Sequence, residues 1–216
     1  MISHYNSDDK QSCSSTVKEA SLESNTLRVS HYLRNHIKDS CFISSFILIC
    51  GFAIGALIGL SFDVPLPEEL VITEPPSQQW IFQNNSQVAL GLCLGGLVFG
   101  TITIAILLFN SLLIGLWFQE RIRSQGIVMA LLLVGPHGIF EIPALMLAGA
   151  IGVDIARWTF HSFFSNSSSE NDLPEKEEKS SKVFIRRLVI RIIVIEVLLY
   201  VASFVEAYLT PLLVGV

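Results

Sequence analysis

The chain has 216 residues; 51% of them are hydrophobic, only 15% are charged, and the mean hydropathy is +0.56. A soluble domain carries roughly a quarter charged residues, so this composition excludes an ordinary soluble protein. The formal net charge of −5 also argues against a nucleic-acid partner, which would need a basic face on the protein.

The N-terminal segment, residues 1–40, is rich in Ser, Asn, Lys and His and lacks hydrophobic periodicity over most of its length. A segment of this composition buries too little apolar surface to fold by itself. We therefore expect a largely disordered tail, followed by a helical membrane domain over residues 41–216.

The first uncharged run covers residues 41–62. At about 1.5 Å per residue, a helix of this length crosses the hydrocarbon core of a bilayer. Within it Gly51, Gly55 and Gly59 recur at every fourth position. This small-residue spacing lets two helices approach closely in lipid, so we expect the glycine face to pack against another helix.

Residues 63–84 contain several prolines and acids and neither Lys nor Arg, a composition that predicts an extracytoplasmic loop. The next run, 86–118, carries no charge and is too long for one straight span. Asn110 interrupts its apolar pattern, so we expect the chain to break near residues 109–110. Asn85 stands at the entry of this run.

Residues 135–143 read GPHGIFEIP and divide the apolar stretch 126–158. Two prolines and two glycines predict an interruption of the helix. Two arrangements then remain open: a re-entrant hairpin with its turn near the membrane middle, or two full spans with the turn near the outer face. Either way, the fold class is an all-α, polytopic transmembrane bundle of about four or five membrane segments.

The C-terminal part begins with residues 165–182, a low-complexity stretch of Ser, Glu and Lys that predicts a solvated cytosolic linker. The final span, from about residue 184 to 214, carries Arg191, Glu196 and Glu206 within its apolar sequence. Ionisable residues inside a span are costly and mark candidate functional positions.

The Lys and Arg residues indicate the orientation, because cytoplasmic flanks of membrane spans are enriched in them. They gather in residues 1–40, 119–125 and 157–191. All three clusters lie on the cytosolic face if the N-terminus is cytosolic and residues 126–156 enter and leave the membrane from the cytosolic side. We expect a multi-pass protein of the plasma membrane with an extracytoplasmic C-terminus.

His137 and Glu141 are the strongest candidates for chemistry, because residues four apart share one face of a helix. They could form a proton relay, half of a metal site or a general acid/base pair. The structural interpretation, which we favour, is that His137 caps the Gly/Pro break and Glu141 accepts hydrogen bonds from freed backbone N–H groups. Glu206, Asn85 and Asn110 are further polar candidates, and pairing of Glu206 with His137 stays open.

The known catalytic patterns are absent from the sequence: it contains neither HExxH nor GxSxG, and no other His lies in a membrane segment. A metal site needs three or four ligands. The four cysteines form no CxxC pair. We therefore predict no catalytic residue, no cofactor and no metal, and a protein that is not an enzyme.

The run from Pro136 to Ala144, with Ala148-Gly149-Ala150 and Gly152 after it, closely resembles the signature of the stage II sporulation protein M family of membrane proteins. The resemblance covers about residues 40–216 and extends to further positions: Asn84-Asn85, Asn110, Glu206-Ala207 and Pro211. Ser111 departs from the family pattern, which commonly has Gly there, and the linker at 165–182 is private to this chain.

The resemblance implies a membrane scaffold. In spore-forming bacteria the family's namesake anchors peptidoglycan-degrading partners during engulfment and is not itself the hydrolase. We expect a scaffold or assembly subunit that lies in the lipid bilayer and binds membrane or cell-envelope proteins, or itself, through its glycine-rich faces. The alternative is a small transporter or channel subunit in which His137, Glu141 and Glu206 line a polar pathway.

Overall fold

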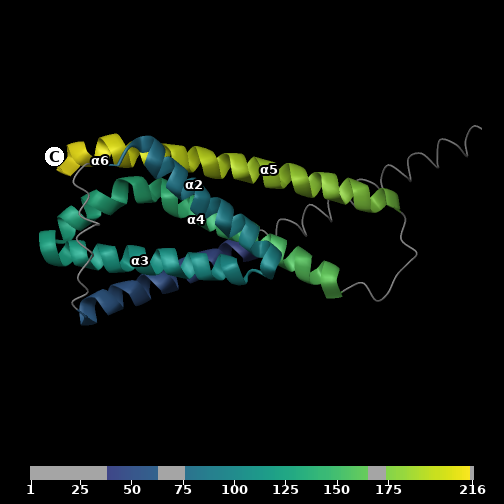
Figure 1. The fold of residues 1–216 in the computed structure, drawn as a ribbon, viewed down its shortest axis with the longest axis horizontal. Helices are drawn as coiled ribbons and strands as arrows, with labels where there is room; N and C mark the ends of the chain where they lie inside the picture. Colours follow the sequence, from purple (N-terminus) through teal and green to yellow (C-terminus); the bar gives the residue numbers. More distant parts are fainter. Residues whose placement is uncertain (1–37, 63–75, 165–173, 215–216) are drawn as a thin grey trace, which may run out of the picture. The chain divides into compact units, whose positions relative to one another are not determined.

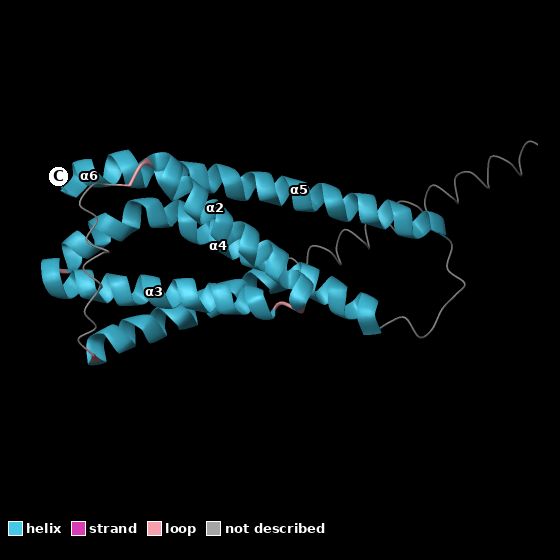
Figure 2. Cartoon of the chain, in the orientation of Figure 1, coloured by secondary structure: helices cyan, strands magenta, loops and turns pink. Residues whose placement is uncertain are grey.

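The computed structural model of the chain describes residues 38–62, 76–164 and 174–214 (Figure 1). Contacts divide the chain into two units, 1–39 and 40–216, and the fold presented here is that of the second. Every regular element in the described ranges is helical (Figure 2), which confirms the all-α prediction. The predictions for residues 1–37, 63–75 and 165–173 lie outside the described residues.

The described elements follow one another along the chain as a series of long helices joined by short turns. They are an initial helix at Lys38–Ser61, α2 (Gln78–Leu94), the 3₁₀ turn η2 (Gly95–Val98), α3 (Thr101–Gln125), α4 (Ile127–Phe164), α5 (Pro174–Phe204), the π-helical turn η3 (Val205–Leu209) and α6 (Thr210–Val214). Two predicted non-helical segments are therefore shorter than expected. The predicted loop 63–84 gives way to helix α2 from residue 78, and the predicted linker 165–182 gives way to helix α5 from residue 174.

Four of these helices are long and apolar enough to cross a membrane: Lys38–Ser61, Thr101–Gln125, Ile127–Phe160 and Ile185–Leu213. Helix α2 has 17 residues, a length of about 25 Å, and lies among the others (Figure 1). Four candidate spans in the described residues agree with the prediction of about four or five membrane segments.

The chain reverses direction between α2 and α3, not at Asn110 as predicted. The turn uses Phe99 and Gly100, which both adopt left-handed backbone angles, with φ of 52° and 76°. Helix α3 runs through Asn110 without a break, because the Asn110 amide Nδ2 donates a hydrogen bond of 2.8 Å to the Ile106 carbonyl of its own helix. A polar residue that bonds its own backbone need not interrupt a helix.

Helix α4 is a single helix that contains both Pro136 and Pro143. It is thus neither a re-entrant hairpin nor two spans, and the predicted interruption is a bend that Figure 1 shows in its first half. Proline removes one backbone donor and kinks a helix, but the packing of α4 against α2, α3 and α5 holds it together.

One consequence of the continuous α4 is that residues 119–125 lie at the end of the bundle opposite to Ser40. Arg123 Nη2 donates a hydrogen bond to the Gly59 carbonyl, near the end of the initial helix. The basic residues of 119–125 therefore do not share a side with those of 157–191, and the expectation that all clusters lie on one side is wrong.

The glycine face of the initial helix lies against α3. A Cβ atom built on Gly55 would be 2.1 Å from the Leu112 carbonyl oxygen, and one on Gly51 would be 1.9 Å from Ser111 Oγ. The contact is reciprocal, because a Cβ on Gly115 would be 2.2 Å from the Phe52 carbonyl oxygen. Only glycine allows the two backbones to approach this closely.

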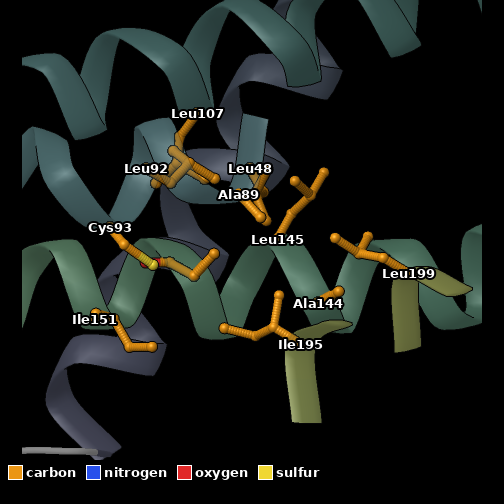
Figure 3. Close-up of a cluster of buried hydrophobic side chains, with 11 residues drawn as sticks. Leu48, Ala89, Leu92, Cys93, Leu107, Ala144, Leu145, Ile151, Ile195 and Leu199 are labelled. Carbon is orange, nitrogen blue, oxygen red and sulfur yellow. The ribbon is translucent and has the colours of Figure 1, made fainter. Parts of the chain in front are cut away.

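The core of the bundle is apolar and centres on α4. Figure 3 shows that side chains from the initial helix and from α2 to α5 meet there. The buried cluster contains Leu48, Ala89, Leu92, Cys93, Leu107, Ala144, Leu145, Ala148, Ile151, Ile195 and Leu199. The small residues on α4 let its neighbours pack close to its axis.

Candidate functional site

Three ionisable side chains from distant parts of the sequence meet inside the bundle: His137 and Glu141 of α4, and Glu206 of η3. One potential ligand atom from each lies within 4.8 Å of the other two. The structure therefore joins the His137–Glu141 pair to Glu206 in one cluster, which we call the His/Glu cluster.

The local backbone explains how α4 presents two of these groups. His137 and Glu141 lie one turn apart between Pro136 and Pro143, on the bent part of the helix. The prolines remove two N–H donors from the helical ladder. Gly135 and Gly138 have no tight neighbours, since a Cβ on Gly135 would meet nothing within 4 Å. The glycines here leave room beside the cluster instead of bringing helices together.

Glu206 reaches the cluster from an irregular turn. It lies in the π-helical turn Val205–Leu209, which is closed by Thr210: its backbone N–H and its Oγ1 both donate to the Val205 carbonyl. Pro211 follows and cannot supply an N–H to the ladder. Single π-helical turns occur frequently at functional sites, because the extra residue redirects the side chains.

The His/Glu cluster contains one buried polar atom without a partner. Nδ1 of His137 is buried and forms no hydrogen bond in the structure. Leaving such an atom unpaired costs about 1–3 kcal/mol relative to a paired one. Nδ1 therefore does not cap the helix break, and the prediction that His137 caps it through its other ring nitrogen stays a prediction.

A second polar group lies at the other end of α4, and the sequence prediction missed it. Asp154 accepts hydrogen bonds from Ser40 Oγ and, at 2.7 Å, from Arg191 Nη1. Arg157 Nη1 also donates to Ser40 Oγ at 3.1 Å. We call this set the Asp154 network. Its sequence signal was the single acid in the apolar stretch 144–156.

The remaining polar candidates lie apart from the His/Glu cluster. Asn110 bonds its own helix, and Asn85 is half-buried on α2 without a recorded hydrogen bond to the described residues. Glu196 accepts a hydrogen bond of 2.8 Å from Ser86 Oγ of α2. Arg191 and Glu196, five residues apart on α5, take partners on different helices: Asp154 of α4 and Ser86 of α2.

An apolar layer separates the His/Glu cluster from the Asp154 network. Ile195 and Leu199 of α5 are at most 2% exposed, and they belong to the same buried cluster as Ala144 and Ala148 of α4. The His/Glu cluster and the Asp154 network therefore lie towards opposite ends of α4. The buried apolar core and the half-buried Ser86–Glu196 hydrogen bond lie between them.

Long apolar helices around these two polar centres define a polytopic integral membrane protein. The family model for Stage II sporulation protein M matches residues 44–211, and the chain belongs to this family, as its sequence resemblance implied. The chain is similar to uncharacterized protein MJ0793 of Methanocaldococcus jannaschii, with 29% identity over 132 residues that cover 61% of this chain and 69% of the relative. No solved structure matches it.

Proposed function

We propose that the chain is an integral membrane scaffold, or assembly subunit, that holds a transmembrane helix of a partner membrane protein against α2. The observation that carries the proposal is a row of exposed amides on α2. Gln79, Gln83 and Gln87 recur every fourth residue and, with Asn84, are exposed on the outer face of this helix.

The amide row lies at membrane depth. Ser86 bonds Glu196, and the Phe82 ring contacts the Tyr200 ring with centroids 5.7 Å apart. On α5 these partners lie about 7 and 13 Å further along the axis than Arg191, at 1.5 Å per residue. We take the Arg191–Asp154 ion pair as one end of a hydrocarbon core about 30 Å thick, which would put Gln83 and Gln87 inside that core.

Amide groups that face lipid lack hydrogen-bond partners, and a polar residue on a neighbouring helix supplies them. The glycine-rich faces, which the sequence suggested as docking surfaces, are filled by the chain itself: the Gly55 face by α3, and Gly96 by Gly152 of α4, whose carbonyl oxygen would be 2.2 Å from an added Cβ. This leaves the amide row as the surface suited to a partner.

The proposal includes a location and an orientation. In the plasma membrane, the end of the bundle with Arg157, Arg187 and Arg191 would face the cytoplasm and the end with Arg121 and Arg123 the exterior. The N-terminus would then be cytoplasmic and the C-terminus extracytoplasmic. The protein would act through binding and not as an enzyme.

A photo-crosslinking amino acid at Gln87 tests the proposal in native membranes with the full-length chain. We expect an adduct with another membrane protein, and we expect the double change Gln83→Leu and Gln79→Leu to reduce its yield. Interhelical hydrogen bonds contribute about 0.6–2 kcal/mol each, so losing two should weaken association about tenfold or more.

Gln125→Leu is the matched control, because it makes the same chemical change at an exposed residue outside α2. It should leave the adduct unchanged. Adducts with lipid alone would contradict the proposal. An adduct with a second copy of the chain would show that α2 mediates self-association, and it would overturn the proposal of a different membrane protein as the partner.

A transporter subunit is the second candidate, and the convergence of His137, Glu141 and Glu206 favours it. Changing Glu141→Gln distinguishes the two functions in reconstituted liposomes. A transporter with this change should still assemble but lose proton or cation flux. A scaffold should show no flux before or after the change.

A further inference from the structure

We propose that the His/Glu cluster binds one divalent transition-metal ion of the Zn²⁺ class through His137, Glu141 and Glu206. The ion would tie α4 to the π-helical turn η3. This site goes beyond the scaffold function and uses different residues from the amide row on α2. It also departs from the sequence prediction of no metal, which was based on the need for three or four ligands and the lack of a second His in a membrane segment.

The geometry of the cluster is close to that of a metal site. The three ligand atoms lie within 4.8 Å of one another. Around a tetrahedral ion with ligand bonds of about 2.1 Å, ligand atoms are about 3.4 Å apart. Closing the cluster around the ion needs movements of about 1 Å, which rotations within two flexible Glu side chains can supply.

The unpaired nitrogen is the second observation that points to a ligand. Nδ1 of His137 is buried without a hydrogen bond, although buried polar atoms nearly always have a partner. A neutral imidazole offers one nitrogen as a metal ligand, and the ring of His137 stands beside two carboxylates without a hydrogen bond at Nδ1 to the described residues.

The charge of the cluster points to a divalent cation. With both carboxylates ionised and the imidazole neutral, the cluster would carry a formal charge of −2, which is costly in a low-dielectric interior. Without a cation, a buried carboxyl group takes up a proton instead. Arg191, the basic residue nearest to Glu206 along the span Ile185–Leu213, forms an ion pair of 2.7 Å with Asp154 instead. One divalent ion would make the cluster neutral.

The ligand types select among divalent ions. Mg²⁺ and Ca²⁺ prefer shells made only of oxygen, whereas an imidazole nitrogen with carboxylates suits Zn²⁺ and its first-row neighbours. Three protein ligands would leave a fourth position for water. We therefore expect Zn²⁺ or Co²⁺ to bind and Mg²⁺ to fail to compete with them.

Equilibrium binding of Zn²⁺ to the purified full-length chain tests the proposal. The protein would be tag-free, held in lipid nanodiscs and stripped with a chelator before titration. We expect one saturable Zn²⁺ per chain, and affinity at least tenfold lower after Glu206→Gln or Glu141→Gln. The matched control is Glu196→Gln, a carboxylate on α5 that bonds Ser86 outside the cluster, and it should bind as the unchanged chain does.

A spectroscopic measurement keeps the test decisive if a variant fails to fold. X-ray absorption of the Zn²⁺-loaded unchanged chain should show one imidazole nitrogen among oxygen ligands. A chain without a saturable site, a shell without imidazole, or equal affinity in the Glu206→Gln and unchanged proteins would overturn the proposal. None of these results depends on the cross-link at Gln87, so the metal site and the scaffold function can fail separately.

Discussion

Replacing Asp154 with Asn is expected to lower the free energy of unfolding by about 2–3 kcal/mol. Asp154 bonds Arg191 and Ser40, which come from α5 and the initial helix, so the change leaves Arg191 without its counter-ion. Removing one partner of a buried pair costs about 3–5 kcal/mol. The expected value is smaller because the two side chains retain 15–19% exposure. Denaturant titration in detergent micelles measures it.

The matched control for this prediction is Glu120→Gln at the other end of the bundle. Glu120 and Arg123 are 3.5 Å apart, with side chains 31% and 37% exposed, so loss of this pair should cost less than about 1 kcal/mol. Changing Asp154 and Arg191 together to Leu should restore part of the loss, since no charge is then left unpaired. Equal effects of Asp154→Asn and Glu120→Gln would contradict the role of the Asp154 network.

Replacing Gly55 with Ala is expected to destabilise the bundle by about 2–3 kcal/mol. The added Cβ would be 2.1 Å from the Leu112 carbonyl oxygen, which belongs to the α3 backbone and cannot turn aside. The two helices must then separate along the whole Gly51–Gly59 face, and overpacking of this kind typically costs 1–3 kcal/mol. The same denaturant titration measures the change.

Gly135→Ala provides the control, because a Cβ at Gly135 would meet nothing within 4 Å. Alanine favours the helix over glycine by about 1 kcal/mol, so this variant should be neutral or slightly stabilised. Equal changes in the free energy of unfolding for Gly55→Ala and Gly135→Ala would contradict the claim that the glycine spacing allows close packing of the initial helix on α3.

The membrane class and the helical architecture could be predicted from the sequence, because they depend on local properties. Uncharged runs long enough to cross a bilayer, as in 41–62, specify spans without reference to the rest of the chain. The glycine spacing at 51–59 likewise predicted a close helix contact, although not that α3 would make it. Membership of the family was visible in the run from Pro136 to Ala144.

The turn between α2 and α3 could not be predicted, because its cause is not in the hydropathy pattern. Phe99 adopts a left-handed angle that its residue type rarely takes, whereas Asn110 looked like a break but bonds its own helix. The continuity of α4 was equally hidden: two prolines predict an interruption, and only packing against the neighbouring helices decides that the helix bends.

The meeting of the site residues also depends on tertiary structure. His137 and Glu141 could be placed on one face from their spacing, but Glu206 joins them through a π-helical turn for which no sequence rule exists. Asp154 had a detectable signal as a lone acid in an apolar stretch. Its partners, Ser40 and Arg191, are far away in the sequence and could not be assigned without the fold.

The single crossing of the membrane by α4 is tested most directly by labelling with a membrane-impermeant thiol reagent. Ser124 and Trp158 are both exposed, near the two ends of the bundle. In a cysteine-free chain, Ser124→Cys and Trp158→Cys should be labelled from opposite faces of the membrane, because one helix separates them. Labelling of both from the same face would contradict the fold, and with it the depth of α2 and the proposed partner surface.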